Sequence, residues 1–531
     1  MKPYRESNAR LRTFTDKWLP AHCDSVSASA SLKQLFPQSS PPWRRHDKIM
    51  PLNTCFSARS GPSWQQLTGL AILVLGFGGL CLWSLTGLLT GIWWIGWACF
   101  MSNALMRLTA CMIKPDGNVP SDILTEAVNE NLPTYSVIVA LYKEASIVPQ
   151  LINAMLALNY PRDRLEILFA LEADDQETLA VFHRQELPAF ARVIAVPLGF
   201  PRTKPRALNH ALEQARGDLI VIYDAEDQPH PGQLLEAAQA FAKGDTMLAC
   251  VQAPLRPAGV NSFIARQFAA EYAVQFDVLL PALHALHLPF PLGGTSNHFK
   301  ADVLRLVGGW DAFNVTEDAD LGLRLAQLGY KTGMIKSPTI ETPPASSQTW
   351  VPQRTRWIKG YMQTLLVHTR LNTPVKPRAC LGLFLGVALS VAAAFCYAPF
   401  SLLVIISLFL TGLQRIGDAA NPLHILATYD LVLFLFGTLS GMITITIAAR
   451  RVGLSIKPAD LLGAPAYWSL QSVAACFALW QLITNPFHWD KTEHMPATFA
   501  VEPLYEDGAY AYGVEYDHHR HPDHLAHQSL G

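Results

Sequence analysis

The sequence is poor in charged residues. They make up 16% of its 531 residues, and half of the residues are hydrophobic, whereas an ordinary soluble domain carries roughly 25% charged residues. This composition excludes an intrinsically disordered chain and a soluble protein of average make-up. The 41 basic residues are balanced by 42 acidic ones, so no broad basic face of the kind that binds nucleic acid is expected.

The nine cysteines form no Cys-x-x-Cys pair. Several of them lie inside apolar runs: Cys81, Cys99, Cys396 and Cys476. This pattern indicates buried thiols in a reducing compartment, and it argues against a disulfide framework or a structural zinc site.

The missing charges are concentrated in four stretches, residues 60–106, 379–414, 431–449 and 461–489. A membrane span needs about 20 apolar residues, so each of the first two stretches can hold a helical hairpin and each of the last two a single helix. The alternative, buried helices of a large soluble core, is disfavoured because such helices rarely run so long without a charge.

A count of six spans creates a conflict. It places Arg450, Arg451 and Lys457 on the far side of the membrane, although basic loops favour the cytoplasmic side. A later segment, for example Leu461–Tyr467, can instead lie in the membrane–water interface and not cross the membrane. We therefore expect four to six spans and a cytoplasmic central region. The expected organisation is a disordered tail (1–60), a transmembrane hairpin (61–112), the central domain (120–374), transmembrane and interfacial helices (379–489) and an irregular tail (490–531).

The central region alternates between strand-like and helix-like patterns. Four runs are typical of buried strands: Tyr135–Leu141, Leu165–Leu171, Arg192–Leu198 and Asp218–Asp224. Helical spacing follows at Ile147–Leu158 and Ala207–Ala215. Apolar strands alternating with helices predict an α/β domain with a parallel sheet covered on both faces.

Acidic and polar residues directly follow three of these strands. They are Tyr142, Glu144, Glu172, Asp174, Asp175, Asp224, Glu226 and Asp227. Ligands of parallel sheets bind at the carboxyl ends of the strands, and so many carboxylates repel one another unless a divalent cation such as Mg²⁺ or Mn²⁺ is present. Because Lys204 and Arg206 follow the third strand, the rim predicts a site for a metal-bound diphosphate. The alternative is a solvated acidic rim.

Three motifs in this order resemble those of membrane-embedded family 2 glycosyltransferases, the group of the cellulose and hyaluronan synthases. They are Tyr223-Asp-Ala-Glu-Asp227, Thr316-Glu-Asp318 and Gln353-Arg-Thr-Arg-Trp357. The strings at 204–209 and 292–298 are similar to those of a bacterial subgroup of large family 2 enzymes. The resemblance covers the central domain and the spans on either side of it.

The resemblance implies a GT-A fold that uses a nucleotide sugar, usually a UDP-sugar, with inversion at the anomeric carbon. It places Asp224 and Glu226 in the metal-binding Asp-x-Asp motif, but Asp227 follows directly, so either Glu226 or Asp227 is the second metal ligand. The implied nucleotide- and substrate-binding residues are Tyr142, Glu144, Glu172, Asp175, Lys204, Asn209, Asp224, Gln353, Arg356 and Trp357.

The resemblance further implies that Asp318 is the general base, which removes the acceptor proton. Arg356 is expected to neutralise the leaving diphosphate, and Trp357 is expected to stack on the acceptor sugar. Lys491 and Thr492 lie in Phe487–His494, where related synthases carry a loop that closes over the nucleotide. The alternative for this string is a juxtamembrane anchor.

The predicted protein is an inverting glycosyltransferase of the bacterial inner membrane that elongates a polysaccharide at the cytoplasmic face. Coupling of elongation to export is a further expectation. Its partners are a nucleotide sugar, a glycan or lipid-linked acceptor and the lipid bilayer. No oligomeric state is predicted. The alternatives are transfer of one sugar to a lipid-linked acceptor, and an inactive membrane scaffold or receptor of the same fold.

Overall fold

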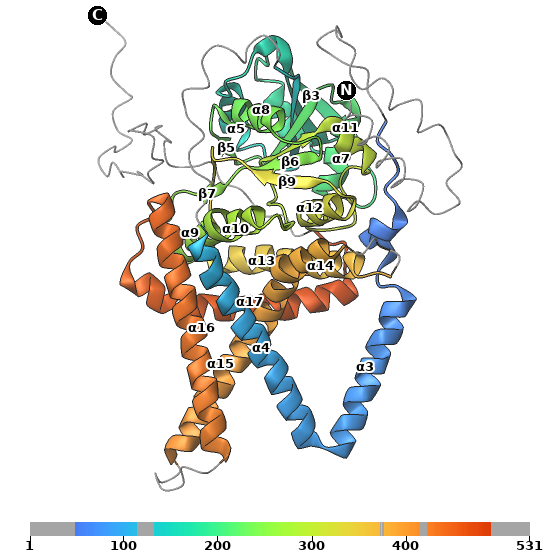
Figure 1. Ribbon diagram of the computed structural model, residues 1–531. Helices are drawn as coiled ribbons and strands as arrows, with labels where there is room; N and C mark the ends of the chain where they lie inside the picture. Colours follow the sequence, from blue (N-terminus) through green and yellow to red (C-terminus); the bar gives the residue numbers. More distant parts are fainter. Residues whose placement is uncertain (1–47, 114–131, 372, 374–375, 414–421, 490–531) are drawn as a thin grey trace, which may run out of the picture.

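The computed structural model describes residues 48–113, 132–371, 373, 376–413 and 422–489. Figure 1 shows an α/β domain at the top, a layer of helices that run across its lower side, and long helices that extend away from it. The predicted Lys491 and Thr492 lie outside the described residues, as do most of the two predicted tails.

A seven-stranded sheet forms the centre of the domain, in the order β3-β2-β1-β4-β8-β6-β9. The first four strands are parallel, as predicted, whereas β8 runs antiparallel to both β4 and β6. The sheet is therefore mixed. Its strands are β1 (Tyr135–Leu141), β2 (Leu165–Glu172), β3 (Ala191–Val196), β4 (Leu219–Tyr223), β6 (Leu248–Gln252), β8 (Asn297–Lys300) and β9 (Lys331–Met334), and a small sheet holds β5 (Gln228–Pro229), β10 (Thr339–Glu341) and β7 (Leu255–Pro257).

Alternate residues of the central strands supply two separate cores. Val137 and Val139 point to one face of the sheet, whereas Ile138 points to the other, because successive side chains of a strand lie on opposite faces. The first face is covered by α5 (Val148–Leu156), α6 (Gln176–Phe182) and α8 (Gln233–Lys243), and the second by α7 (Lys204–Gln214), α11 (Ala301–Leu306) and α12 (Glu317–Gln327).

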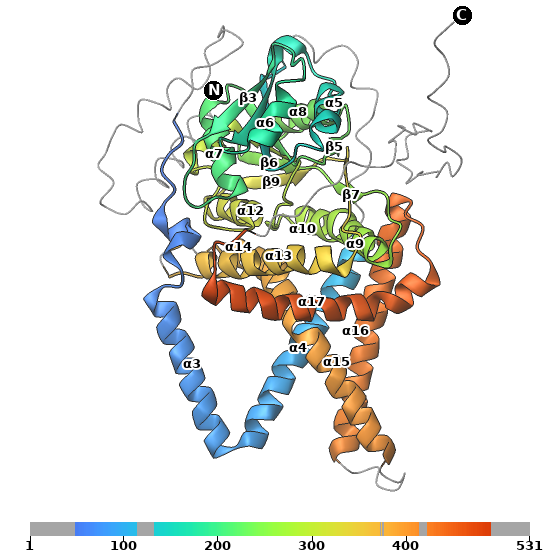
Figure 2. The ribbon, with the colours of Figure 1, turned by 180° about the vertical axis from the view of Figure 1, so that it is seen from behind.

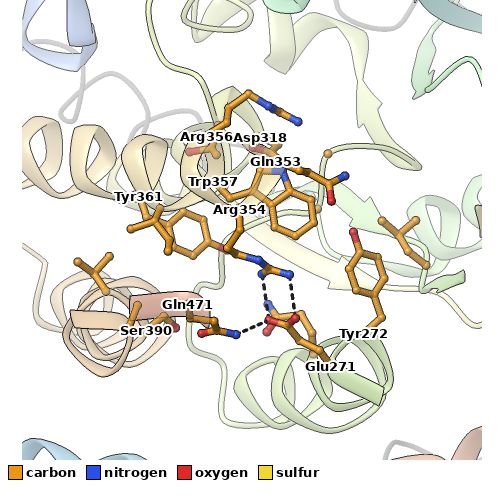
Figure 3. A pocket seen from close by; sticks show the side chains of 18 of the residues that line it. Glu271, Tyr272, Asp318, Gln353, Arg354, Arg356, Trp357, Tyr361, Ser390 and Gln471 are labelled. Carbon is orange, nitrogen blue, oxygen red and sulfur yellow. Dashed lines mark hydrogen bonds and ion pairs between the residues drawn. The ribbon is translucent and has the colours of Figure 1, made fainter. Parts of the chain in front are cut away.

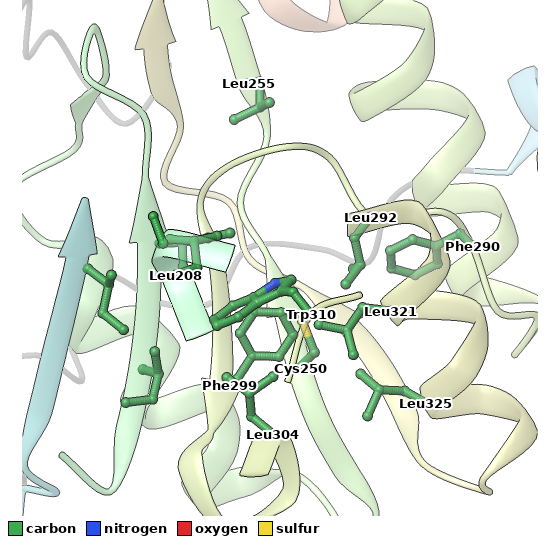
Figure 4. Packing of buried hydrophobic residues seen from close by; sticks show 14 of the residues in the cluster. Leu208, Cys250, Leu255, Phe290, Leu292, Phe299, Leu304, Trp310, Leu321 and Leu325 are labelled. Carbon is green, nitrogen blue, oxygen red and sulfur yellow. The ribbon is translucent and has the colours of Figure 1, made fainter. Parts of the chain in front are cut away.

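Trp310 occupies the middle of the second core. Figure 4 shows its indole between Phe299 of β8 and Leu321 of α12. The Phe299 and Trp310 rings lie edge to face, with centroids 5.8 Å apart, which is a favourable arrangement for aromatic pairs. This packing fixes the loop before α12, and α12 carries the predicted base.

Below the domain, further helices connect it to the apolar part of the chain. These are α9 (Phe263–Val274), the π-helical η7 (Gln275–Leu279), α10 (Leu280–Ala285), α13 (Ser347–His368), α14 (Pro377–Leu383), the π-helical η8 (Phe384–Ala388), α3 (Trp64–Trp83), α4 (Leu85–Met112), α15 (Leu389–Leu413), α16 (Pro422–Val452) and α17 (Pro458–Thr484). Among the described residues, four segments are long and apolar enough to cross a membrane: Trp64–Trp83, Leu85–Met112, Pro377–Ile406 and Thr428–Val452.

Two of the charge-free stretches fold differently from the hairpin and the span that we expected. Residues 377–413 form one continuous run of helix, not a hairpin. Helix α17 runs alongside α13, across the direction of α15 and α16 (Figures 1 and 2). Its Tyr467, Ala474 and Ala478 are buried, so its apolar residues partly serve contact with the domain. The interfacial position considered for part of this segment stays a prediction.

The basic residues Arg450 and Arg451 lie in the last turn of α16, at its domain end. Arg451 donates hydrogen bonds to the carbonyl oxygens of Asp277 (2.7 Å), Cys111 (2.8 Å) and Ile113 (3.0 Å). With two candidate spans before the domain and two after it, these cations are on the domain's side of the apolar helices. The conflict with the charge rule that six spans created is thereby removed.

Residues 48–60, which the sequence places in the tail, are docked on the domain. They form two short 3₁₀ helices, η2 (Thr54–Phe56) and η3 (Ala58–Ser60). Asp311 accepts a hydrogen bond from the amide of Ala58 (2.6 Å), and Arg370 donates to four carbonyl oxygens between residues 54 and 61. This segment therefore belongs to the folded unit.

Candidate active site

A cavity of about 550 Å³ begins beyond the carboxyl ends of β1, β2 and β4, and continues between α9 and α13 to α4, α15 and α16. It brings together most of the residues predicted from the sequence. These are Tyr142, Glu144, Glu172, Lys204, Asp224, Glu226, Asp318, Gln353, Arg356 and Trp357. Asp175, Asn209 and Asp227 do not line it.

Two ion pairs organise the strand-end part of the cavity. Lys204, the first residue of α7, donates hydrogen bonds to the Asp224 carboxylate and to the carbonyl oxygen of Gly294 (2.8 Å). Burial lowers the pKa of Lys204, but Asp224 and Glu317 outweigh burial and raise it to about 12. Arg206 forms two hydrogen bonds, of 2.7 and 2.6 Å, to Glu172. The rim therefore holds fixed cations next to its acids.

The acids of the Asp-Ala-Glu-Asp segment point in different directions. Asp224 and Glu226 line the cavity, whereas Asp227 is only 1% exposed. Its carboxyl group accepts hydrogen bonds from the Asp224 amide (2.7 Å) and the Thr295 hydroxyl. Burial, together with Asp224 and Glu226, raises the pKa of Asp227 well above its ordinary value. Asp227 therefore braces the turn that presents the other two acids.

Asp175 and Asn209 shape the loops around the cavity. Asp175 caps α6 by accepting a hydrogen bond from the Thr178 amide (3.2 Å). The Asn209 side chain bonds to both the carbonyl oxygen (2.7 Å) and the amide (2.9 Å) of Trp310. Gly309 beside it has a φ of 64°, and a Cβ there would lie 2.3 Å from Asn209 Oδ1, so this turn requires glycine.

Glu317 and Asp318 lie in the first turn of α12, where the helix dipole favours negative charge. Burial raises the pKa of Asp318 to about 6, although Lys204 and Arg356 oppose the shift. Burial and the charge of Asp318 raise the pKa of Glu317 to about 8. Within the part of the chain that the structure describes, Asp318 Oδ1 is buried and has no hydrogen-bond partner. Such an oxygen is ready to accept a proton from a ligand.

Arg356 and Trp357 extend from α13 on adjacent sides of the cavity (Figure 3). The guanidinium of Arg356 lies 4.4 Å from the centre of the Trp489 ring. Burial lowers the pKa of Arg356 from its ordinary value, against the opposing charges of Glu317 and Asp318. The Trp357 ring lies near Phe268 and Tyr272, at 6.2 Å from each. The segment after α17 thus reaches the site through Trp489.

The cavity also contains polar residues that the sequence did not single out: Glu271, Tyr272, Glu341, Arg354 and Tyr361. Arg354 stands inside the Gln353–Trp357 motif, which was a usable signal. The other four lie outside every motif. Burial and the acids at 227 and 226 raise the pKa of Glu341 well above its ordinary value.

The carboxylates offer a partial set of metal ligands. Within the described ranges, no group of three or more His, Cys, Asp and Glu side chains is arranged to hold a metal ion. Asp224 and Glu226 do present two carboxylates to the cavity. Mg²⁺ and Mn²⁺ take oxygen ligands and commonly complete their shell with phosphate oxygens and water. The residues present therefore fit an ion that arrives with a diphosphate.

The central domain is similar to known proteins. Residues 133–360 match the family model described as "Glycosyltransferase like family 2". The beta-monoglucosyldiacylglycerol synthase of Synechocystis is 26% identical over 287 residues, which cover 52% of this chain and 58% of that protein. The cellulose synthase 1 catalytic subunit of Komagataeibacter xylinus is 25% identical over 302 residues, which cover 55% of this chain and 37% of that protein.

A solved structure of a mannosyltransferase from Pyrobaculum calidifontis, in complex with GDP-Man and Mn²⁺, is 20% identical. It aligns with a TM-score of 0.41 over 73% of this chain and 96% of its own. The chain spans 58% or less of the two relatives above. The predicted resemblance is confirmed by the family model, and the predicted fold class is confirmed by the α/β domain that lies between apolar helices.

Proposed function

We propose that the family 2 glycosyltransferase domain at residues 133–360 transfers a sugar, with inversion, from a nucleotide sugar to a hydroxyl group of a growing glycan at the membrane surface. One observation supports this most strongly. A single cavity joins the strand-end acids and Lys204 to Asp318, Arg356 and Trp357, and then continues among the helices that can cross a membrane.

The strand-end part suits a nucleoside diphosphate. Tyr142 and Glu144 offer an aromatic face and a carboxylate to the nucleoside, and Lys204 offers a buried cation to the phosphates. Asp224 and Glu226 would hold Mg²⁺ or Mn²⁺, which would neutralise the diphosphate when bound. Asp227 is assigned to the turn, because its carboxyl group bonds to that turn's backbone and to Thr295.

The chemical step needs only one base. An oxygen of the Asp318 carboxylate takes the proton of the acceptor hydroxyl, and the hydroxyl oxygen forms a bond to the anomeric carbon. The bond from that carbon to the diphosphate breaks, and its electron pair remains on the diphosphate oxygen. Arg356 and Lys204 stabilise the charge that develops there. Because the nucleophile attacks opposite the leaving group, the configuration inverts.

The acceptor leaves or enters on the membrane side. We place the domain on the cytoplasmic face of a bacterial inner membrane, because Arg450 and Arg451 lie at the domain end of α16 and basic residues favour that face. A growing glycan would stack on Trp357 and continue between α4, α15 and α16. The chain would then be elongated at the surface and guided into the membrane for export.

One observation favours a second candidate, a lipid-linked acceptor. In the membrane helices the cavity is lined by apolar side chains such as Phe100, Ala393 and Phe434. Such a lining suits an acyl or prenyl chain, whereas a sugar polymer gains more from hydrogen-bonding groups. In this case a single sugar would be added to a lipid whose headgroup reaches Asp318.

The donor is tested by incubating the purified full chain with UDP-glucose, UDP-N-acetylglucosamine, UDP-galactose or GDP-mannose, and measuring the release of nucleoside diphosphate with Mn²⁺ or Mg²⁺. We expect release with one donor class and loss of turnover in excess EDTA. Turnover that survives EDTA would contradict the metal assignment. If none of the four donors gives release above the background of the Asp318→Asn variant, the proposed enzyme is contradicted.

The product decides between the two acceptors. Membranes that contain the chain are supplied with the radiolabelled donor, and the label is then divided between long polymer and lipid extract. Label in polymer that resists solvent extraction and yields oligosaccharides on hydrolysis supports elongation. Label confined to a single-sugar glycolipid supports the second candidate.

A further inference from the structure

One carboxylate joins three helices where the active-site cavity passes between α9 and α13. Glu271 of α9 accepts two hydrogen bonds from Arg354 of α13, of 2.9 and 2.8 Å. It also accepts one from Tyr467 (2.7 Å) and one from Gln471 (3.3 Å), both on α17. Trp350 of α13 donates to the same Tyr467 hydroxyl (2.8 Å). Figure 3 shows Arg354 and Gln471 converging on Glu271.

This arrangement fixes the ring that the proposed function assigns to the acceptor. Arg354 precedes Trp357 by three residues, so both side chains lie on one face of α13. The Arg354 guanidinium lies 4.5 Å from the centre of the Trp357 ring and 5.1 Å from that of Trp350. Since Glu271 holds the guanidinium in a two-pronged contact, it also sets where Trp357 can stack.

The position of the pair in the cavity distinguishes it from ion pairs that serve the fold alone. The side chains of Arg354 and Glu271 are 10% and 28% exposed, and both residues line the cavity. By contrast, the Asp320–Arg324 pair of α12 is completely buried. Burial lowers the pKa of Arg354, but Glu271 together with Tyr467, Tyr272 and Tyr361 outweighs burial, and the net shift of that pKa is upward. The cation therefore remains charged beside the acceptor position.

We propose that Glu271, Arg354 and Tyr467 form a positioning clamp that sets the Trp357 ring for the acceptor and couples it to α17. They are positioning residues and take no part in the chemical step. Because Tyr467 and Gln471 of α17 bond to Glu271, a shift of α17 would move the Trp357 ring and change the ratio in which the acceptor and water reach the anomeric carbon. The proposed clamp depends on the proposed function in one respect, namely that the ligand of Trp357 is the acceptor.

The chain supplies a matched control. Arg266 and Asp460 form a 2.8 Å ion pair between the same two helices, α9 and α17, but neither residue lines the active-site cavity. Glu271→Gln keeps the shape of the side chain and removes its charge, and Asp460→Asn does the same at the control site. Any effect of loosening α17 in general should appear in both variants.

The test uses the donor selected by the panel above and membranes that contain the native acceptors. It measures the ratio of sugar transferred to an acceptor to sugar released by hydrolysis. In Glu271→Gln we expect the ratio of transfer to hydrolysis to fall roughly tenfold, the effect of losing about one charge-assisted hydrogen bond. The affinity for UDP with Mn²⁺, measured by calorimetry, should stay within about twofold. Asp460→Asn should keep the wild-type ratio. An unchanged ratio in Glu271→Gln, or an equal fall in both variants, would overturn the clamp.

A second measurement does not depend on catalysis. The chain is labelled with 5-fluorotryptophan, and the ¹⁹F resonance that disappears in Trp357→Phe is assigned to Trp357. That resonance should shift or broaden in Glu271→Gln and stay unchanged in Asp460→Asn; the reverse pattern would refute the clamp. If the wild type neither transfers nor hydrolyses any donor, the proposed function fails, while the resonance still decides the clamp.

Discussion

The two ends of the cavity are built in different ways. At the donor end, Lys204 and Asp224 lie 20 residues apart in the sequence. They meet because Lys204 follows β3 and Asp224 follows β4, and the parallel strands β3, β2, β1 and β4 end at one edge of the sheet. At the acceptor end, Glu271 meets Arg354 across 83 residues and Tyr467 across 196. Sheet geometry therefore brings the donor residues together, whereas packing between helices assembles the acceptor residues. Changes at the two ends should separate donor binding from acceptor use.

The largest effect is expected where the two ends meet. Asp318→Asn removes the base but keeps the shape of the side chain, so the transfer rate should fall by roughly 10²–10⁴-fold. The affinity for UDP with Mn²⁺ should change little, because Asp318 is assigned to the acceptor proton. Steady-state release of nucleoside diphosphate and calorimetry on the same preparations test both statements. A variant that keeps wild-type turnover would exclude Asp318 as the base.

A pair of substitutions separates the two ends directly. Lys204→Met removes a buried cation from the diphosphate, so the affinity for UDP should fall by roughly tenfold to a hundredfold. Trp357→Ala should leave that affinity unchanged and lower the ratio of transfer to hydrolysis by up to roughly tenfold. Calorimetry and product partition measure the two quantities. If both variants lose both properties equally, the division into a donor end and an acceptor end is wrong.

The pH dependence identifies which acid of α12 is the base. Burial raises the pKa of Asp318 to about 6 and that of Glu317 to about 8. Each carboxyl group keeps its proton below its own pKa, and a base must be deprotonated. With Asp318 as the base, kcat/KM of the free enzyme should rise tenfold per pH unit up to about 6 and then level off. A rise that continues to about pH 8 and is lost in Glu317→Gln would assign the role to Glu317.

The smallest effect is expected at Asn209, which was predicted to bind substrate but bonds to the Trp310 backbone. Asn209→Ala removes two hydrogen bonds from a buried turn. It should lower the Tm by roughly 2–10 °C and leave the affinity for UDP unchanged. A thermal melt in detergent and calorimetry measure these. Loss of UDP affinity at an unchanged Tm would instead show that Asn209 binds the nucleotide, as the sequence predicted.

The contrast between the two ends also explains how far the sequence could be interpreted. The strands at 135–141 and 165–171 were predictable because each is a continuous apolar run, and their polar ends followed from the rule for parallel sheets. The direction of Asp227 was not predictable, since it depends on the Thr295 hydroxyl from a distant loop. Glu271 carried no signal, because one acid on a buried helix resembles any other until its partners are known.

The membrane part shows the same limit. Charge-free stretches located the apolar helices, but they did not distinguish a hairpin from the long continuous helix at 377–413. Nor did they reveal that α17 would lie against α13. Its Tyr467 and Asp460 bond to α9, and these contacts follow from tertiary packing, which hydropathy does not record.

The most direct test of the central claim is the configuration of the newly formed linkage. The central claim is a single displacement in which Asp318 activates the acceptor. The donor selected by the panel carries its sugar in a known anomeric form, and the ¹H NMR coupling of the anomeric proton in the product reports the new one. An α-linked donor should give a β-linked product. An α-linked product would require a second displacement and would contradict the account.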